Sequence, residues 1–139
     1  MKIQFQYNRE KDIWCLLNKG KSSNNSQNPT KVYEQLVSEY SENPTNDEAS
    51  LFIDTYISDN NISPQIYTSK YQKDWDTVAS EYEKRAEKIF GVSLPVDVVG
   101  YLTVNNRCPY DINDNHFFVA FPISSARRII MHELWHFYT

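Results

Sequence analysis

The sequence predicts a single α+β domain over residues 1–139, with a mostly helical part, residues 1–95, followed by a small antiparallel sheet packed on a buried helix. Apolar side chains recur at three- and four-residue spacing through much of the first part, which is typical of amphipathic helices. Two runs rich in β-branched and aromatic residues follow and favour strands. The last segment is apolar on nearly every side, which indicates a buried helix.

The elements of the first part follow from periodicity and from residues that start or stop helices. Alternation of apolar and polar side chains predicts a strand at the start of the chain, and a polar segment with a proline near its end predicts a connector. The clearest helix carries Tyr71, Trp75 and Tyr82 on one face and stops at Gly91. The expected order is a strand (2–7), a short helix (9–18), a connector (20–30) and three helices, which start near Thr30, Asn46 and Tyr71.

The second part contains two predicted strands, residues 96–104 and 116–121, and a final helix, residues 126–139. A polar loop, residues 105–115, separates the strands. Because only a loop joins them, we expect the two strands to pair antiparallel.

Composition and charge narrow the class of protein. The chain has 14 Lys and Arg against 18 Asp and Glu, a net charge of −4, whereas proteins that bind nucleic acid are usually basic. The longest apolar run near the start, residues 13–17, is too short for a signal peptide or a membrane span. Cys15 and Cys108 form no CxxC pair, so we expect free thiols in a reducing compartment. The prediction is a cytoplasmic protein without a nucleic-acid or membrane partner.

A run of side-chain oxygens, Asp111-x-Asn113-x-Asn115, resembles the start of a calcium-binding loop. Such a loop needs Gly at its sixth position and a bidentate Glu at its twelfth. These positions hold His116 and Pro122, so the sequence does not predict a calcium site.

The final helix contains the pattern H-E-x-x-H, formed by His132, Glu133 and His136. Residues four apart lie on one helix face, so both imidazoles can reach one metal ion, and the intervening carboxylate can accept a proton from a metal-bound water. Burying these polar groups without partners would cost several kcal/mol, which a metal would relieve. The alternative is a hydrogen-bonded His–Glu–His cluster without metal.

This segment resembles the zincin metallopeptidases, over the predicted strand 116–121 and the final helix. The resemblance implies that His132 and His136 bind Zn²⁺ and that Glu133 is the catalytic general base. It also implies that an extended peptide or protein substrate pairs along the strand before the motif helix, residues 116–121.

The subclass depends on the third zinc ligand. In the metzincins a Gly follows the second His by three positions, but this chain has Thr139 there. The chain is therefore closer to the gluzincins, whose third ligand is a Glu from a later helix. We expect that ligand beyond Thr139 and the 139 residues to be part of a longer chain. The upstream alternatives are Cys108, Asp111, Asp114 and His116, and we expect none of them to serve, because loop residues seldom replace a rigid ligand.

The sequence thus predicts a zinc-dependent metallopeptidase whose 139 residues alone bind zinc weakly and do not hydrolyse peptides. The alternative is a non-catalytic zinc-binding or protein-interaction domain. A small helical interaction protein without metal is the third hypothesis.

Overall fold

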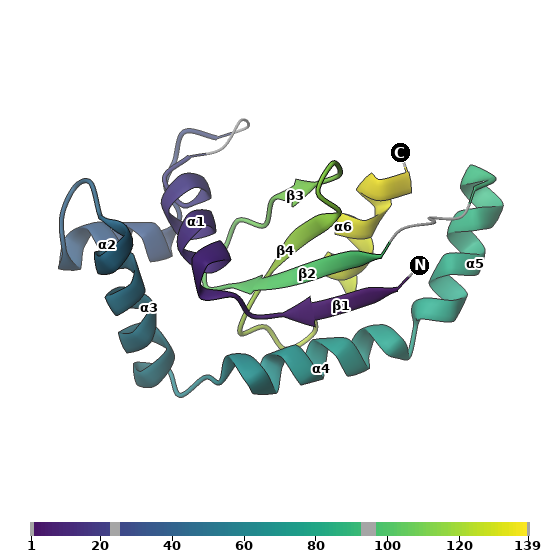
Figure 1. Ribbon diagram of the computed structural model, residues 1–139, viewed down its shortest axis with the longest axis horizontal. Helices are drawn as coiled ribbons and strands as arrows, with labels where there is room; N and C mark the ends of the chain where they lie inside the picture. Colours follow the sequence, from purple (N-terminus) through teal and green to yellow (C-terminus); the bar gives the residue numbers. More distant parts are fainter. Residues whose placement is uncertain (1, 23–25, 93–96, 139) are drawn as a thin grey trace.

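The computed structural model describes residues 2–22, 26–92 and 97–138, which form six helices and a four-stranded sheet (Figure 1). The α+β class is confirmed. The elements are β1 (Ile3–Gln6), α1 (Arg9–Lys19), α2 (Lys31–Glu39), α3 (Asn46–Asp59), α4 (Pro64–Asp76), α5 (Ala79–Phe90), β2 (Val98–Thr103), β3 (Tyr110–Asp111), β4 (His116–Ala120) and α6 (Arg127–Tyr138). None of the helices within the described ranges is long and apolar enough to cross a membrane.

The sheet is mixed, with strand order β1-β2-β4-β3. β1 and β4 both run parallel to β2, and β3 runs antiparallel to β4. The expected antiparallel pairing of the two long strands is therefore wrong. After β2 the chain crosses to the outer edge, forms the short strand β3 and turns back, so that β4 lies between β2 and β3 (Figure 1). The polar loop expected over 105–115 contains β3, which is too short to show a periodicity.

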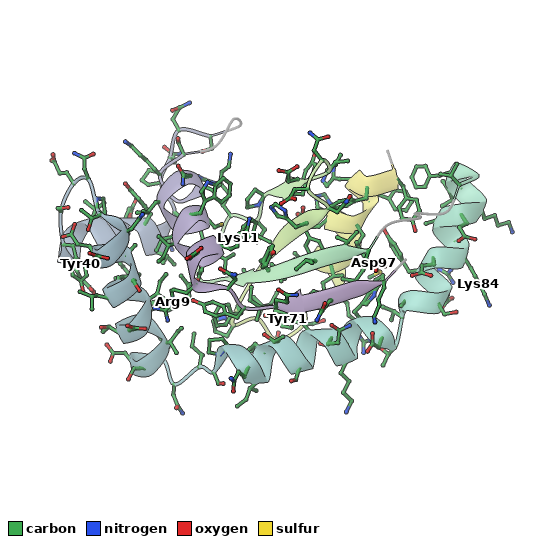
Figure 2. The ribbon with its side chains drawn as sticks, in the orientation of Figure 1. Arg9, Lys11, Tyr40, Tyr71, Lys84 and Asp97 are labelled. Carbon is green, nitrogen blue, oxygen red and sulfur yellow. The ribbon has the colours of Figure 1, made fainter. Side chains whose placement is uncertain are left out.

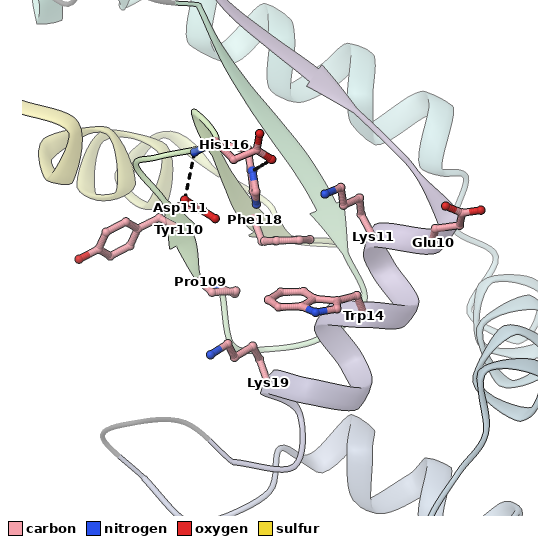
Figure 3. A pocket seen from close by; sticks show the side chains of 10 residues that line it. Glu10, Lys11, Trp14, Lys19, Pro109, Tyr110, Asp111, His116 and Phe118 are labelled. Carbon is pink, nitrogen blue, oxygen red and sulfur yellow. Dashed lines mark hydrogen bonds and ion pairs between the residues drawn. The ribbon is translucent and has the colours of Figure 1, made fainter.

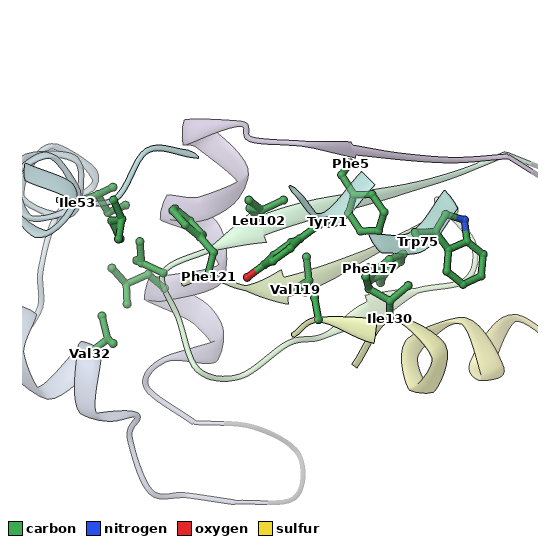
Figure 4. Packing of buried hydrophobic residues seen from close by; sticks show 14 of the residues in the cluster. Phe5, Val32, Ile53, Tyr71, Trp75, Leu102, Phe117, Val119, Phe121 and Ile130 are labelled. Atoms are coloured by element: carbon green, nitrogen blue, oxygen red, sulfur yellow. The ribbon is translucent and has the colours of Figure 1, made fainter. Parts of the chain in front are cut away.

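Strand β4 is covered on both faces. Phe117 and Val119 belong to the main apolar core with Tyr71 of α4 and Ile130 of α6 (Figure 4). On the opposite face, Phe118 stacks on Trp14 of α1 with the ring centroids 5.8 Å apart. A strand buried on both sides is expected to be apolar along its whole length, which explains the run HFFVA.

Glycine is needed in the middle of β2. A Cβ at Gly100 would lie 2.8 Å from the ring of Phe5 and 2.9 Å from that of Phe117. These two rings meet edge to face at Gly100 of β2, with their centroids 6.0 Å apart. The close contact between β1 and β4 side chains therefore depends on the missing side chain at Gly100.

Helix boundaries follow local rules with one exception. Thr30 caps α2, and Gly91 ends α5 in the left-handed conformation, as predicted. The helix expected to run unbroken from Tyr71 to Gly91 is instead two helices, α4 and α5, separated at Thr77 and Val78. The Thr77 hydroxyl donates to the Asp74 carbonyl at 2.8 Å and competes with continuation of the helix.

One edge of the sheet is closed by a side chain. The Phe5 backbone N–H donates to Gln72 Oε1 at 3.0 Å, and Gln72 Nε2 donates to the Ile3 carbonyl at 2.9 Å. The amide of Gln72 thus pairs with β1 as a neighbouring strand would. This protects the β1 edge from pairing with another chain.

A buried carboxylate joins α1 to the end of β2. Asp12 accepts hydrogen bonds from the Tyr7 hydroxyl at 2.8 Å, the Thr103 hydroxyl at 2.7 Å and the Val104 backbone N–H at 3.1 Å. Burial raises the pKa of Asp12 to about 6, although these bonds act in the opposite direction. The folded chain therefore holds this proton more tightly than the unfolded chain does.

This raised pKa predicts the pH dependence of stability. Between about pH 4 and pH 6 the folded state binds a proton that the unfolded state releases, so the free energy of unfolding falls as the pH rises through this window. We expect Asp12→Asn, which keeps an acceptor for Thr103 and Val104, to remove the Asp12 share of this slope, worth at most ~3 kcal/mol. The share of Glu133, whose pKa burial also raises, should remain. Urea unfolding from pH 4 to pH 8 measures the slope. The exposed control Asp59→Asn should keep the slope, and an unchanged slope in Asp12→Asn would contradict the assignment.

Candidate functional site

The helix that carries the HExxH motif is positioned by α4. Tyr71 of α4 lies between its helix and the sheet (Figure 2). Its hydroxyl donates to the Ala120 carbonyl at the end of β4, at 2.9 Å, and accepts from the Ile123 N–H at 3.1 Å. Lys70 Nζ donates to the Ser124 carbonyl at 2.7 Å. These bonds fix the turn between β4 and α6, so the sheet determines where α6 begins.

A second helix holds α6 at its middle. The Tyr82 hydroxyl of α5 donates to the Met131 carbonyl at 2.9 Å. The Tyr82 ring also lies edge-on to Trp135, and Phe90 stacks on Tyr138 with centroids 5.4 Å apart. Sequence reasoning placed Tyr82 in the core but did not assign it this contact.

Only one face of α6 is buried. Ile130 and Leu134 are fully buried beneath the sheet, and Glu133 is 7% exposed. His132 is exposed, and Trp135 is 39% exposed. The sequence predicted a helix buried on all sides, and this is wrong because α4, α5 and β4 contact one side of α6 and leave the face carrying His132 open.

The two motif histidines lie side by side, as the four-residue spacing predicts. Their ring centroids are 5.0 Å apart and the ring planes are nearly perpendicular, at 88°. The ring of His136 stacks on Tyr110 of β3, with centroids 4.0 Å apart and planes at 10°. Partial burial and the neighbouring His132 lower the pKa of His136, which favours the neutral imidazole that binds metals.

Tyr110 is a site residue that sequence reasoning did not identify. It lies in the segment 105–115, which carried no strand signal, and its contact with His136 joins residues 26 positions apart in the sequence. Its position on the edge strand places the histidine pair directly beside the end of the sheet.

Glu133 lies on the buried side of α6, in a poorly solvated position. Burial raises the pKa of its carboxyl group to about 7. Its Oε2 atom is buried and makes no hydrogen bond to any described residue. Glu133 and His132 line a cavity of about 320 Å³ together with Cys108 and Arg128. A buried carboxylate oxygen without a partner is costly, so this cavity offers a place for a donor or a cation.

The structure separates the four upstream candidates for a third ligand. Cys108 shares the cavity with His132 and Glu133, and burial raises the pKa of its thiol to about 12, which disfavours the thiolate that binds metals. Asp111, Asp114 and His116 instead line a different cavity, against α1. Within the described ranges, no three His, Cys, Asp or Glu side chains are arranged to hold a metal ion.

The residues present fit part of a zinc site. Two adjacent imidazoles and a buried carboxylate oxygen without a hydrogen-bond partner are the donor set that a zinc ion and its water use. A catalytic zinc takes three protein ligands, and the described residues supply two. A scan against protein-family models and searches of the curated proteins and of the solved structures found no match to this chain.

The role of Tyr71 in placing α6 can be tested by removing one oxygen atom. Tyr71→Phe leaves the buried Ala120 carbonyl and Ile123 N–H without their partner, and we expect the free energy of unfolding to fall by ~1–3 kcal/mol. Chemical denaturation measures this loss. Tyr67→Phe on the same helix is the matched control, because the Tyr67 hydroxyl makes no hydrogen bond to the described residues. Equal effects of the two substitutions would contradict the role of the Tyr71 hydroxyl.

Proposed function

We propose that this chain carries the metal-binding helix of a zinc-dependent peptidase. His132 and His136 hold the zinc ion, and Glu133 is the general base. The observation that carries this proposal is a pair of adjacent imidazole rings, one of which shares a cavity with the buried carboxylate of Glu133. The Oε2 atom of this carboxylate has no hydrogen-bond partner among the described residues. We also propose a cytoplasmic location, which the free thiols of Cys15 and Cys108 support.

Bound zinc supplies a Lewis acid toward the peptide carbonyl. The chain's own residues have distinct tasks in the proposed reaction. Glu133 accepts a proton from the attacking water and passes it to the leaving amine, and its burial suits it to hold that proton between the two steps. The stack with Tyr110 fixes the ring plane of His136 and so orients one ligand.

The substrate edge differs from the one expected from the sequence. The predicted strand 116–121 contains β4, which lies between β2 and β3, and β3 already pairs with it at His116 and Phe117. We propose instead that an extended peptide pairs with the outer edge of β3, which lies beside His136 through Tyr110. The closure of the β1 edge by Gln72 supports this choice, because the sheet is protected at one edge and not at the other.

The third zinc ligand completes the proposal. By resemblance to the gluzincins, we propose a glutamate located beyond Thr139. The alternative function is a non-catalytic zinc-binding or protein-interaction domain, and the observation that favours it is the two-ligand set of the described residues. The two functions differ in whether Glu133 is needed for turnover.

Zinc titration against a chromophoric chelator tests the metal site. We expect one zinc per chain, with an affinity that His132→Ala and His136→Ala each lower by more than ~100-fold, since loss of an outer-shell partner alone costs ~10–100-fold. His116→Gln is the matched control and should leave zinc binding unchanged, because His116 lines the other cavity. Zinc binding that neither alanine substitution weakens would contradict the assignment of His132 and His136 as metal ligands.

Glu133→Gln separates the enzyme from the structural zinc domain. In a chain extended to include the proposed third ligand, we expect this variant to keep zinc and to lose peptide hydrolysis by ~100-fold or more. Cleavage of a peptide library, followed by mass spectrometry, measures the loss. Hydrolysis that is absent from the extended chain, or is undiminished by Glu133→Gln, would favour the non-catalytic alternative.

A further inference from the structure

A second cavity, of about 550 Å³, lies between α1 and the β3–β4 hairpin (Figure 3). Its volume falls in the range that holds small molecules. None of its lining residues belongs to the HExxH motif. They are Glu10, Lys11, Trp14 and Lys19 of α1, and Pro109, Tyr110, Asp111, Asp114, His116 and Phe118 of the hairpin region.

The cavity has an aromatic wall. Trp14 is 44% exposed, although its ring stacks on the buried ring of Phe118 at 5.8 Å and 22°. Figure 3 shows the indole extending from α1 toward Pro109 across the cavity. A large apolar ring held rigidly beside an open space offers a stacking surface for another planar ring.

Opposite charges line the two sides of this aromatic wall. Lys11 and Lys19 come from α1, whereas Asp111 and Asp114 come from the hairpin (Figure 3). With Glu10, the lining holds three carboxylates and two ammonium groups. This excess of negative charge disfavours a phosphate dianion. On the α1 side the two ammonium groups outnumber the Glu10 carboxylate, whereas the hairpin side carries only carboxylates, and this favours a ligand that is itself dipolar.

A buried imidazole on the cavity wall faces a carboxylate without forming a hydrogen bond to it. His116 is 8% exposed, and its Nδ1 is 3.1 Å from Asp114 Oδ2 without the alignment of a hydrogen bond. Its ring lies edge-on to that of Phe118, with the centroids 5.6 Å apart (Figure 3). Because Nδ1 forms no hydrogen bond to Asp114, the Asp114 carboxylate keeps its acceptor capacity for a cationic group of a ligand.

We propose that this cavity binds a small aromatic zwitterion, that is, an aromatic amino acid, free or at the end of a dipeptide. Its ring stacks on Trp14, its carboxylate pairs with Lys11 or Lys19, and its ammonium group pairs with Asp111 and Asp114. The proposal is independent of zinc and of peptidase activity, because the cavity uses neither motif histidine.

Isothermal titration calorimetry of the 139-residue chain tests the proposal, with L-phenylalanine and the dipeptide Ala-Phe as the two probes. We expect saturable one-to-one binding of at least one probe, unchanged by EDTA. Phenylacetate lacks the ammonium group, phenethylamine lacks the carboxylate, and adenosine monophosphate carries a phosphate. Each of these should bind about tenfold more weakly or not at all.

Substitutions assign the contacts. Trp14→Ala should weaken binding by about tenfold, in line with the loss of an aromatic pair and its buried area. Asp111→Asn should also weaken binding, and it preserves the local turn because the amide oxygen still accepts from the Asp114 N–H. It therefore tests the site even if Trp14→Ala fails to fold. Trp135→Phe and Lys73→Gln are controls outside the cavity and should bind as the parent does.

Three results would overturn the proposal. The first is no saturable binding of either probe up to about 10 mM, well above the ~1 mM range of weak small ligands. The second is equal or tighter binding of adenosine monophosphate, which would indicate a phosphate site. The third is probe binding that both Trp14→Ala and Asp111→Asn leave unchanged, which would place the ligand elsewhere.

Discussion

The two hydrogen bonds of the Tyr71 hydroxyl connect the central sheet to the motif helix. One bond ends at the last residue of β4 and the other at the turn that precedes α6. Because Tyr71 is fully buried and packs on Phe5 at the same time, the turn cannot shift without breaking the core. The direction of α6, and with it the position of His132 and His136, follows from this side chain.

The burial of β4 on both faces produces two separate sites on one strand pair. One face of the β3–β4 hairpin directs Tyr110 toward His136, while the other directs Asp111 and His116 toward α1. Alternation of side chains along a strand makes this division unavoidable. The proposed peptidase site and the proposed zwitterion site therefore share a backbone segment and the side chain of Tyr110, which stacks on His136 and also lines the cavity.

The two buried carboxyl groups among the described residues illustrate how hydrogen-bond partners decide the role of such a group. Burial raises the pKa of both Asp12 and Glu133. Asp12 accepts three hydrogen bonds, so both of its carboxylate oxygens have partners, and these bonds hold α1 against the end of β2. Glu133 leaves Oε2 without a described donor. A buried polar atom that the fold does not satisfy is available for chemistry, which is why Glu133, and not Asp12, is placed in the proposed reaction.

The sequence by itself determined what depends on local spacing. The caps at Thr30 and Gly91, the α+β class and the shared face of His132 and His136 all follow from residues within one or two helical turns of each other. The tertiary structure alone decided the parallel pairing of β2 and β4, the edge strand β3, and the contacts of Tyr71 and Tyr110. These depend on contacts between residues far apart in the chain, because strand order is set by which faces are covered and not by any repeat along the sequence. The same reason explains why the sequence identified the histidine pair but not the cavity beside Trp14, whose two walls come from opposite ends of the chain.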